Sequence, residues 1–296
     1  MTDTEIFTHI VEADGPSKGF TITGRRRPLP GASGVPLIIA IHGGTYTSKY
    51  FDVDGYSLFD QAEAKGIPII ALDRPSYEGS TPVDERAESI ILENARVLEP
   101  VIGELWEQYG EGLTGVVIIG HSIGGAVTTA IAASQPSWPL LGIALSGCLV
   151  RVPDGPREAF DQLPPITLIE LPSPMKDSVM FGPEGTYEAG MPEASHVSDT
   201  TVPRAELIDI NNGWIDRMKS VAAGVEVPVY ARQAEFDALW ITDADQAAEF
   251  GAAFSSSPRV DSALWPNVGH CIDFHKTATE FQQSQLDFAL SVSGKG

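Results

Sequence analysis

Short, nearly unbroken runs of apolar residues alternate along this chain with longer segments in which apolar residues recur every three or four positions. The short runs are typical of strands in a parallel sheet, because helices bury both faces of such a sheet. The longer segments are typical of helices that bury one face. The alternation therefore predicts an α/β fold with a mostly parallel, doubly wound sheet.

The expected elements follow this alternation from end to end. Strands are predicted over residues 6–12, 19–24, 36–41, 67–72, 115–119, 140–145, 227–231 and 260–265. Helices are predicted over residues 55–65, 86–109, 123–134, 214–223, 243–254 and 277–292. We expect the first two strands to pair with each other, and Thr242 to be the N-cap of the helix over 243–254.

The alternation stops after residue 149, and residues 150–212 are rich in proline. Proline lacks a backbone N–H and restricts φ, so this density excludes a central strand and any long helix. We predict a core built from residues 1–149 and 213–296, with 150–212 inserted as a lid over a pocket. The alternative is a structural excursion that packs on its own aromatic side chains.

Composition excludes several classes of partner. The chain carries 19 Lys and Arg against 40 Asp and Glu, a formal net charge of −21. Such a surface repels nucleic-acid phosphates and anionic lipids, so we expect neither nucleic acid nor membrane as a partner. We find no secretory signal and no apolar run of the ~18 residues that span a bilayer. Cys148 and Cys271 have no metal-site spacing, which favours a reduced, cytoplasmic protein without a metal. The oligomeric state stays open.

One glycine-rich motif points to nucleophilic chemistry. Gly120-His121-Ser122-Ile123-Gly124-Gly125 directly follows a predicted strand and opens a predicted helix. A serine oxygen reacts only when it is exposed and paired with a base, and a sharp strand-to-helix turn lifts it clear of the sheet. The backbone N–H of Ile123, at the helix N-terminus, is then directed towards the reacting carbonyl. Ser122 is therefore the candidate nucleophile, and Ile123 a candidate oxyanion-hole donor.

This placement resembles the α/β-hydrolase superfamily, and in particular its serine esterases, over nearly the whole chain. Residues 42–45, His-Gly-Gly-Thr, follow a predicted strand and look like the family's oxyanion loop. The resemblance implies that Gly44 supplies the second oxyanion N–H, with Thr45 as the alternative donor. Residues 73–80 resemble a family turn in which glycines are common. Ser76 and Glu78 stand in two of those places, which predicts a different shape for that loop.

The resemblance also implies two partners for the serine. Residues 228–237 resemble a family pattern whose last aspartate orients the catalytic histidine, so Asp237 is the candidate acid and Glu235 its rival. Arg232 and Gln233 are polar, which predicts an early end to the strand before them. His270 follows the last predicted strand and matches the family's general base. The order Ser, Asp, His is the order of this fold.

The other histidines have structural interpretations. We expect His42 to be a hydrogen-bonding residue of the oxyanion loop and His121 to pack beside the nucleophile. His275 is expected near the start of the closing helix. His9 and His196 are expected to be exposed.

The substrate pocket is the least constrained part of the site. We expect Thr45, Tyr46, Phe181, Trp214 and Trp240 to line it, with core packing as the alternative for each. The resemblance implies hydrolysis of a carboxylic ester of a small, apolar or aromatic substrate through an acyl-enzyme, without a cofactor. Lactone opening, thioester cleavage, acyl transfer and carbon–carbon cleavage use the same triad and are alternatives. A non-catalytic ligand receptor is a third class, against which the complete triad argues.

Overall fold

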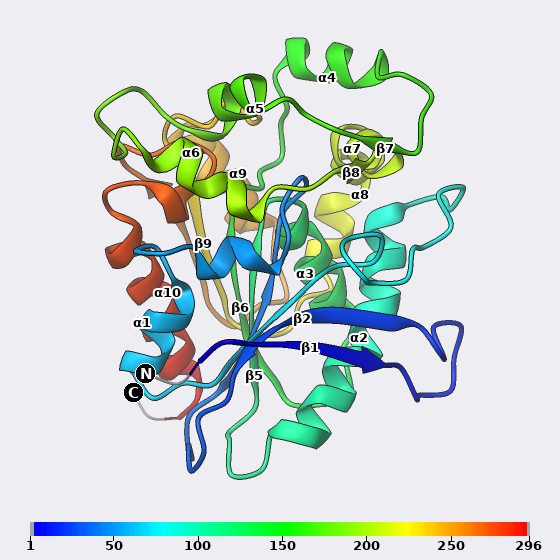
Figure 1. The fold of residues 1–296 in the computed structure, drawn as a ribbon, viewed down its shortest axis with the longest axis vertical. Coiled ribbons are helices and arrows are strands. Elements are labelled where there is room, and N and C mark those ends of the chain that lie inside the picture. The colour runs from blue at the N-terminus through cyan, green and yellow to red at the C-terminus, as the bar shows by residue number, and fades with distance from the viewer. Residues whose placement is uncertain (1–2, 295–296) are drawn as a thin grey trace.

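The computed structural model describes residues 3–294, and a single sheet of eight strands runs through the molecule (Figure 1). The strand order is β1-β2-β4-β3-β5-β6-β9-β10. β2 pairs antiparallel with β1 and with β4, and all other neighbours are parallel. The strands are β1 (Glu5–Ile10), β2 (Thr21–Arg27), β3 (Leu37–Ile41), β4 (Ile69–Leu72), β5 (Val116–His121), β6 (Leu140–Ser146), β9 (Val229–Ala234) and β10 (Val260–Trp265). The predicted fold class is confirmed.

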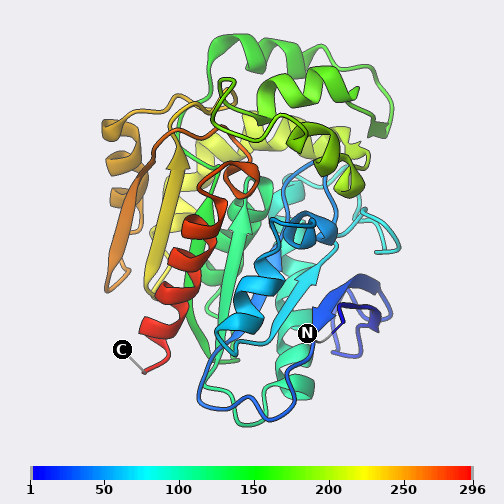
Figure 2. The ribbon, with the colours of Figure 1, turned by 60° about the vertical axis from the view of Figure 1, so that its left-hand side comes forward.

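Helices cover both faces of the sheet (Figure 2). One face carries α2 (Ile90–Tyr109), α3 (Ile123–Ala133), α8 (Gly213–Ala222) and α9 (Ala244–Ala253). The other carries η1 (Ser48–Asp52), α1 (Leu58–Ala64), η3 (Ile272–Phe274) and α10 (Ala278–Val292). Every residue of β3, β4 and β5 is buried, because alternate side chains enter alternate helix layers. This explains why the apolar runs are continuous rather than alternating.

Every predicted strand and helix occurs, and two details differ. β9 does not end early, because Gln233 is buried and its Oε1 accepts a hydrogen bond of 3.1 Å from the backbone N–H of Cys148. The N-cap of α9 is Asp243 rather than Thr242. The carboxylate of Asp243 accepts from the backbone N–H of Gln246 at 2.7 Å, which satisfies an otherwise unpaired donor of the first turn.

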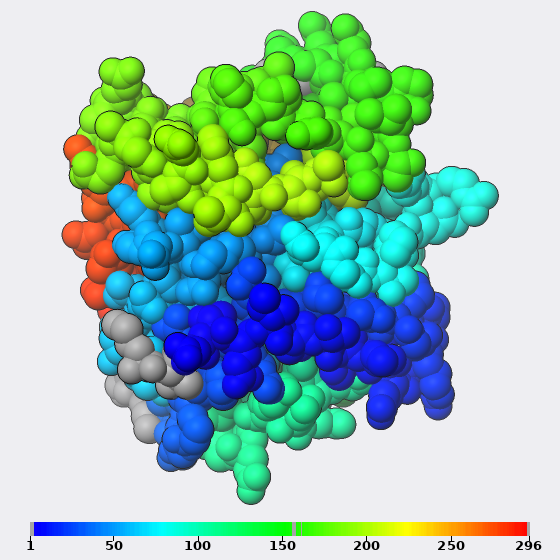
Figure 3. All heavy atoms as spheres, in the orientation of Figure 1, coloured from blue at the N-terminus to red at the C-terminus, as the bar shows by residue number. Residues whose placement is uncertain are grey.

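The proline-rich segment forms a cover over the carboxyl ends of the strands, at the top of Figures 1 and 3. Its helices are short, since α4, α5 and α7 have eight residues each. Its elements are α4 (Asp154–Asp161), β7 (Leu168–Ile169), α5 (Ser173–Met180), α6 (Met191–Ser195), η2 (His196–Ser198), β8 (Val202–Pro203) and α7 (Arg204–Asn211). We refer to residues 150–212 as the lid.

The last lid helix, α7, is joined to the core by buried carboxylates. Glu206 forms an ion pair with Arg74, and neither side chain is exposed by more than 1%. One turn later, Asp209 accepts from the hydroxyl of Ser89 at 2.7 Å and from the backbone N–H of Ile91 at 3.0 Å. Buried charges must keep such partners, so α7 is held in one position on the core.

Candidate active site

Ser122 lies in the sharp turn between β5 and α3. Its backbone has φ 55° and ψ −124°, a strained conformation for a residue with a side chain. A Cβ on Gly124 would collide with the backbone carbonyls of Ile41 and His42, on the neighbouring strand and loop. A Cβ on Gly120 would likewise collide with the backbone of α3. Close packing of this turn against the sheet therefore requires both glycines.

The structure brings Ser122, His270 and Asp237 together at the carboxyl edge of the sheet. His270 Nε2 lies 2.9 Å from Ser122 Oγ, and His270 Nδ1 lies 2.7 Å from Asp237 Oδ2. His270 is 1% exposed and Asp237 8%. The carboxylate accepts from Nδ1–H, which leaves Nε2 free to accept from the serine hydroxyl. This arrangement can deprotonate Ser122 as it attacks a carbonyl.

The rival carboxylate has a different partner. Glu235 is exposed, and its Oε2 accepts from the backbone N–H of Asn267 at 2.8 Å. Asn267 has a φ of 58°, so this bond supports a turn in the loop that leads to His270. Asp237 is held in place by the N–H of Leu239, which donates to its other oxygen at 2.9 Å.

The two expected oxyanion donors flank Ser122 in one pocket. Ile123 is the first residue of α3, and the first N–H groups of a helix have no acceptor within it. Gly44 follows β3, which is the immediate neighbour of β5 in the sheet. The helix N-terminus also carries partial positive charge, which favours an anion at this position.

Arg74 supports the oxyanion loop from below. Its Nε donates to the carbonyl of His42 at 2.8 Å, and one terminal nitrogen donates to the carbonyl of Gly43 at 3.1 Å. The turn that contains Arg74 keeps a left-handed backbone at Ser76 (φ 74°) and Glu78 (φ 48°). Two residues with side chains thus adopt the left-handed conformation that glycine favours.

A lysine that the sequence did not single out supports the same loop from the lid. Lys176 is 2% exposed; its Nζ donates to the carbonyl of Thr45 at 3.0 Å and pairs with Asp199. The backbone N–H of Thr200 donates to the same carbonyl at 3.0 Å. Thr45 has a φ of 65°, which is unfavourable for a β-branched residue. The two donors therefore stabilise a strained residue next to Gly44.

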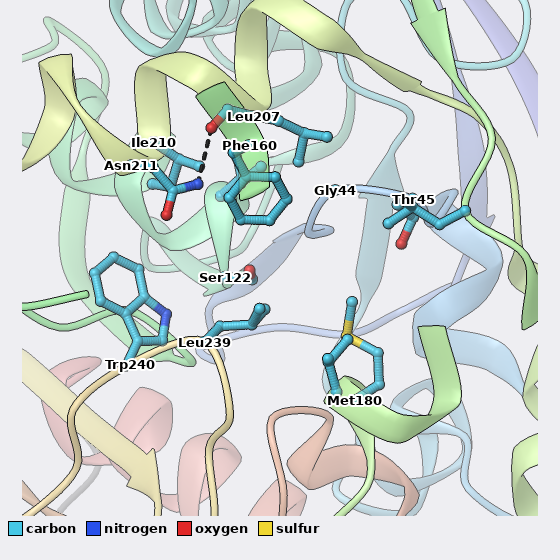
Figure 4. Close-up of a pocket in the computed structure, with 13 residues that line it drawn as sticks. Gly44, Thr45, Ser122, Phe160, Met180, Leu207, Ile210, Asn211, Leu239 and Trp240 are labelled. Atoms are coloured by element: carbon cyan, nitrogen blue, oxygen red, sulfur yellow. Dashed lines mark hydrogen bonds between the residues drawn. The ribbon is translucent and has the colours of Figure 1, made fainter. Parts of the chain in front are cut away.

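A pocket opens above Ser122 and has about 560 Å³ of empty space, part of it open to solvent (Figure 4). Its walls come from the oxyanion loop, from α3, from the lid and from the loop after β9. They are formed by Gly44, Thr45, Ser122, Ile123, Phe160, Leu171, Val179, Met180, Leu207, Ile210, Asn211, Leu239 and Trp240. None of these described residues is charged, so the pocket suits a neutral, largely apolar group.

Three of the five residues that were expected to line the pocket do not line it. Thr45 and Trp240 belong to it, whereas Tyr46, Phe181 and Trp214 do not. Tyr46 is 1% exposed and its hydroxyl lies 3.3 Å from Cys271 Sγ, beneath the loop. Phe181 packs against other aromatic rings, and Trp214 lies in the core under α8. These large apolar rings are buried in the protein interior instead of facing the pocket.

The lid contributes most of the residues that sequence reasoning missed. Phe160, Leu171, Val179, Met180, Leu207, Ile210 and Asn211 come from α4, α7 and the chain between them. The apolar residues between the prolines were a general signal for a pocket wall. Nothing in the local sequence distinguishes Asn211 or Lys176 from the polar residues of a surface helix.

The buried histidines act as structural residues. His42 accepts from the backbone N–H of Arg74 at 3.1 Å, and the His121 ring stacks on Tyr50 at 4.8 Å. Burial lowers the pKa of both imidazoles well below the ordinary value. His275 lies in the expected place before α10 and accepts from the N–H of Gly269 at 2.8 Å, and burial lowers its pKa to about 4.

The two histidines expected to be exposed are not. The His9 side chain is 14% exposed and contacts Glu104, and the His196 side chain is 30% exposed and lies 3.1 Å from Asp177. Each imidazole thus contacts a carboxylate from a separate element.

Comparison with known proteins supports the fold and identifies the family. The alpha/beta hydrolase family model matches residues 38–280. Protein phosphatase methylesterase 1 from Homo sapiens is 29% identical over 124 residues, which is 40% of this chain and 28% of that protein. The protein of the same name from Rattus norvegicus is 30% identical over the same length. The chain thus matches under a third of the length of these relatives.

Solved structures agree with the fold over the whole chain. A thermophilic esterase from Thermogutta terrifontis has a TM-score of 0.67 at 15% identity, with 98% of this chain and 99% of the other covered. A haloalkane dehalogenase from Bradyrhizobium elkanii has a TM-score of 0.66 at 15% identity, with 98% of both chains covered. At such identities the likeness concerns the fold and not the reaction.

Over residues 3–294, no helix has the length and apolar character that crossing a membrane requires. The family model covers the strand that leads to the oxyanion loop, the turn at Ser122 and the loops that carry Asp237 and His270. The chain belongs to the alpha/beta hydrolase family.

Proposed function

We propose that this chain is a serine esterase that hydrolyses small, neutral, largely apolar carboxylic esters through an acyl-enzyme. The observation that carries the proposal is the hydrogen-bonded chain from Asp237 through His270 to Ser122, which ends in a pocket whose described lining is uncharged and includes Gly44 and Ile123. The name of the methylesterase relatives supports ester chemistry.

The proposed reaction has two halves. Ser122 Oγ bonds to the ester carbonyl carbon while its proton passes to His270 Nε2, and Asp237 stabilises the imidazolium. The N–H groups of Gly44 and Ile123 hold the oxyanion of the tetrahedral intermediate. The carbon–oxygen bond then breaks, and the imidazolium proton passes to the leaving alcohol. Water attacks the acyl-serine with His270 as base, and the acid and the free enzyme are released.

The pocket supports a neutral substrate. A free carboxylate or ammonium on the substrate would lose its hydration among these side chains, and no described lining residue carries a compensating charge. Lactones, thioesters and acyl-transfer acceptors could react at the same triad, and the lining does not favour any of them over a simple ester.

A panel of p-nitrophenyl esters tests the proposal. We expect turnover of neutral short and medium acyl chains and much slower turnover of chains that end in a carboxylate. Ser122→Ala should lower kcat by at least about 10³-fold with an unchanged circular dichroism spectrum. Ser178→Ala, an exposed serine on α5, is the matched control and should keep full activity. Full activity in Ser122→Ala would refute the proposal.

A further inference from the structure

The α7 wall of the pocket carries one polar side chain, Asn211, on an otherwise apolar surface. Its Nδ2 donates to the backbone carbonyl of Leu207 at 2.8 Å, the contact drawn as a dashed line in Figure 4. If the side-chain amide were rotated by 180°, Oδ1 would face that carbonyl oxygen. Two acceptors cannot form a hydrogen bond, so the orientation of the amide is fixed. Oδ1 consequently points away from Leu207, on the side where Figure 4 shows Trp240.

The position of this oxygen is fixed by the core. Asn211 is 5% exposed and closes α7, the helix that Glu206 and Asp209 join to buried groups of the core. Both carboxylates lie within five residues of Asn211, so the helix end cannot shift without breaking a buried charge interaction. Oδ1 is therefore a preorganised acceptor.

No described residue donates a hydrogen bond to Oδ1, and the pocket is otherwise lined mainly by apolar side chains, among them Phe160, Ile210, Leu239 and Trp240. The indole N–H of Trp240 already donates to the carbonyl of Gly147 at 2.8 Å. An apolar ligand that fills this space strips water from Oδ1 without replacing its hydrogen bond, at a cost of about 1–3 kcal/mol.

We propose that Asn211 selects esters that carry a neutral hydrogen-bond donor, an amide N–H or a hydroxyl, in the part of the substrate that lies in the pocket. The inference rests on the proposed esterase function and narrows its substrate class. A charged ammonium donor does not fit, since no carboxylate is among the described lining residues to balance it.

Matched substrates test this selection. Each pair consists of two p-nitrophenyl esters of equal length, one with a secondary amide in the acyl chain and one with an ester oxygen in place of that N–H. The amide is placed at successive positions along the chain. Wild type should prefer the amide at one or more positions by about 10- to 100-fold in kcat/KM, as expected for an acceptor otherwise left unpaired.

Two variants test whether the Asn211 side chain causes the preference for the amide. Asn211→Leu should reduce the preference to less than about threefold, because the acceptor is gone. Leu239→Met, a lining substitution of similar volume, should retain it. A preference near one in wild type at every position would overturn the inference, and so would an unchanged preference in Asn211→Leu; in both cases ester turnover itself would leave the proposed function standing.

If no ester is turned over, the proposed function is refuted. A binding measurement then still tests the preference for the amide over its oxygen counterpart. The two members of every pair are titrated into Ser122→Ala by calorimetry. In at least one pair the amide should bind about 10-fold more tightly than its oxygen counterpart, and equal affinities in every pair would overturn the inference.

Discussion

Replacing Glu206 by glutamine tests whether α7 is held on the core by its buried ion pair. Burial by itself lowers the pKa of the Arg74 guanidinium, but the Glu206 carboxylate raises that pKa overall. The carboxylate also accepts from the hydroxyl of Tyr77. In Glu206→Gln the guanidinium remains charged and buried without an anion.

The expected loss of stability follows from the burial of this ion pair. Removing one partner of a buried pair costs about 3–5 kcal/mol, because an uncompensated charge stays in the interior. Arg74 retains its bonds to the carbonyls of His42 and Gly43, which places the cost near the lower end. For a chain of this size we expect the melting temperature to fall by about 6–10 °C.

Urea and thermal unfolding followed by circular dichroism measure the effect. Glu5→Gln is the control, because Glu5 pairs with Arg26 at 2.7 Å while 47% of its side chain is exposed. Its loss should cost under about 1 kcal/mol. The double variant Arg74→Met/Glu206→Leu should recover much of the loss, since no charge remains buried. A cost for Glu206→Gln no larger than that of Glu5→Gln would refute the reasoning.

Three further substitutions test the site and its surroundings. Asp237→Asn should lower kcat by about 10⁴-fold and Glu235→Gln by under threefold; the opposite order in ester assays would make Glu235 the acid. Burial raises the pKa of Asp273 to about 6, so its protonated form stabilises the fold at low pH and that contribution is lost as pH rises. In urea titrations, wild type should therefore lose about 2 kcal/mol relative to Asp273→Asn between pH 4 and 7, and a constant difference would contradict this. Lys176→Met should lower kcat about tenfold with little change in KM, because Thr45 loses a donor that holds its strained backbone; an unchanged kcat would assign Lys176 to stability alone.

The sheet could be predicted from the sequence because its pattern is local. Residues 37–41 and 116–119 are apolar at every position, which only burial on both faces explains. The end of β9 could not be predicted in this way. Gln233 is polar but remains in the strand, where a backbone N–H from the neighbouring strand's loop donates to its Oε1.

The proximity of Ser122, Asp237 and His270 could also be predicted from the sequence. The glycines around Ser122 reflect close packing of one turn, and Asp237 and His270 each follow a strand whose carboxyl end reaches the same edge. Parallel strands bring such loops together whatever their separation along the chain.

The pocket lining could not be predicted from the sequence, because it depends on packing between residues that are far apart along the chain. Trp214 and Tyr46 carry large rings close in sequence to the expected site, yet both are buried in the core. In the sequence, Asn211 resembles any polar residue of a helix. It lines the pocket with Ser122 because the buried Arg74–Glu206 ion pair holds α7 on the core. Local sequence has the same limit at the end of β2, where three consecutive arginines stand, because Arg27 is 7% exposed and pairs with Asp60.

Covalent labelling tests the central claim most directly, that Ser122 is the nucleophile of a hydrolase. The protein is incubated with a small uncharged fluorophosphonate while p-nitrophenyl butyrate hydrolysis is followed, and the modified peptide is identified by mass spectrometry. We predict one adduct, on Ser122, that forms at the rate at which activity is lost and is absent from Ser122→Ala. Complete loss of activity with the adduct on another residue, or full activity after stoichiometric modification of Ser122, would contradict the account.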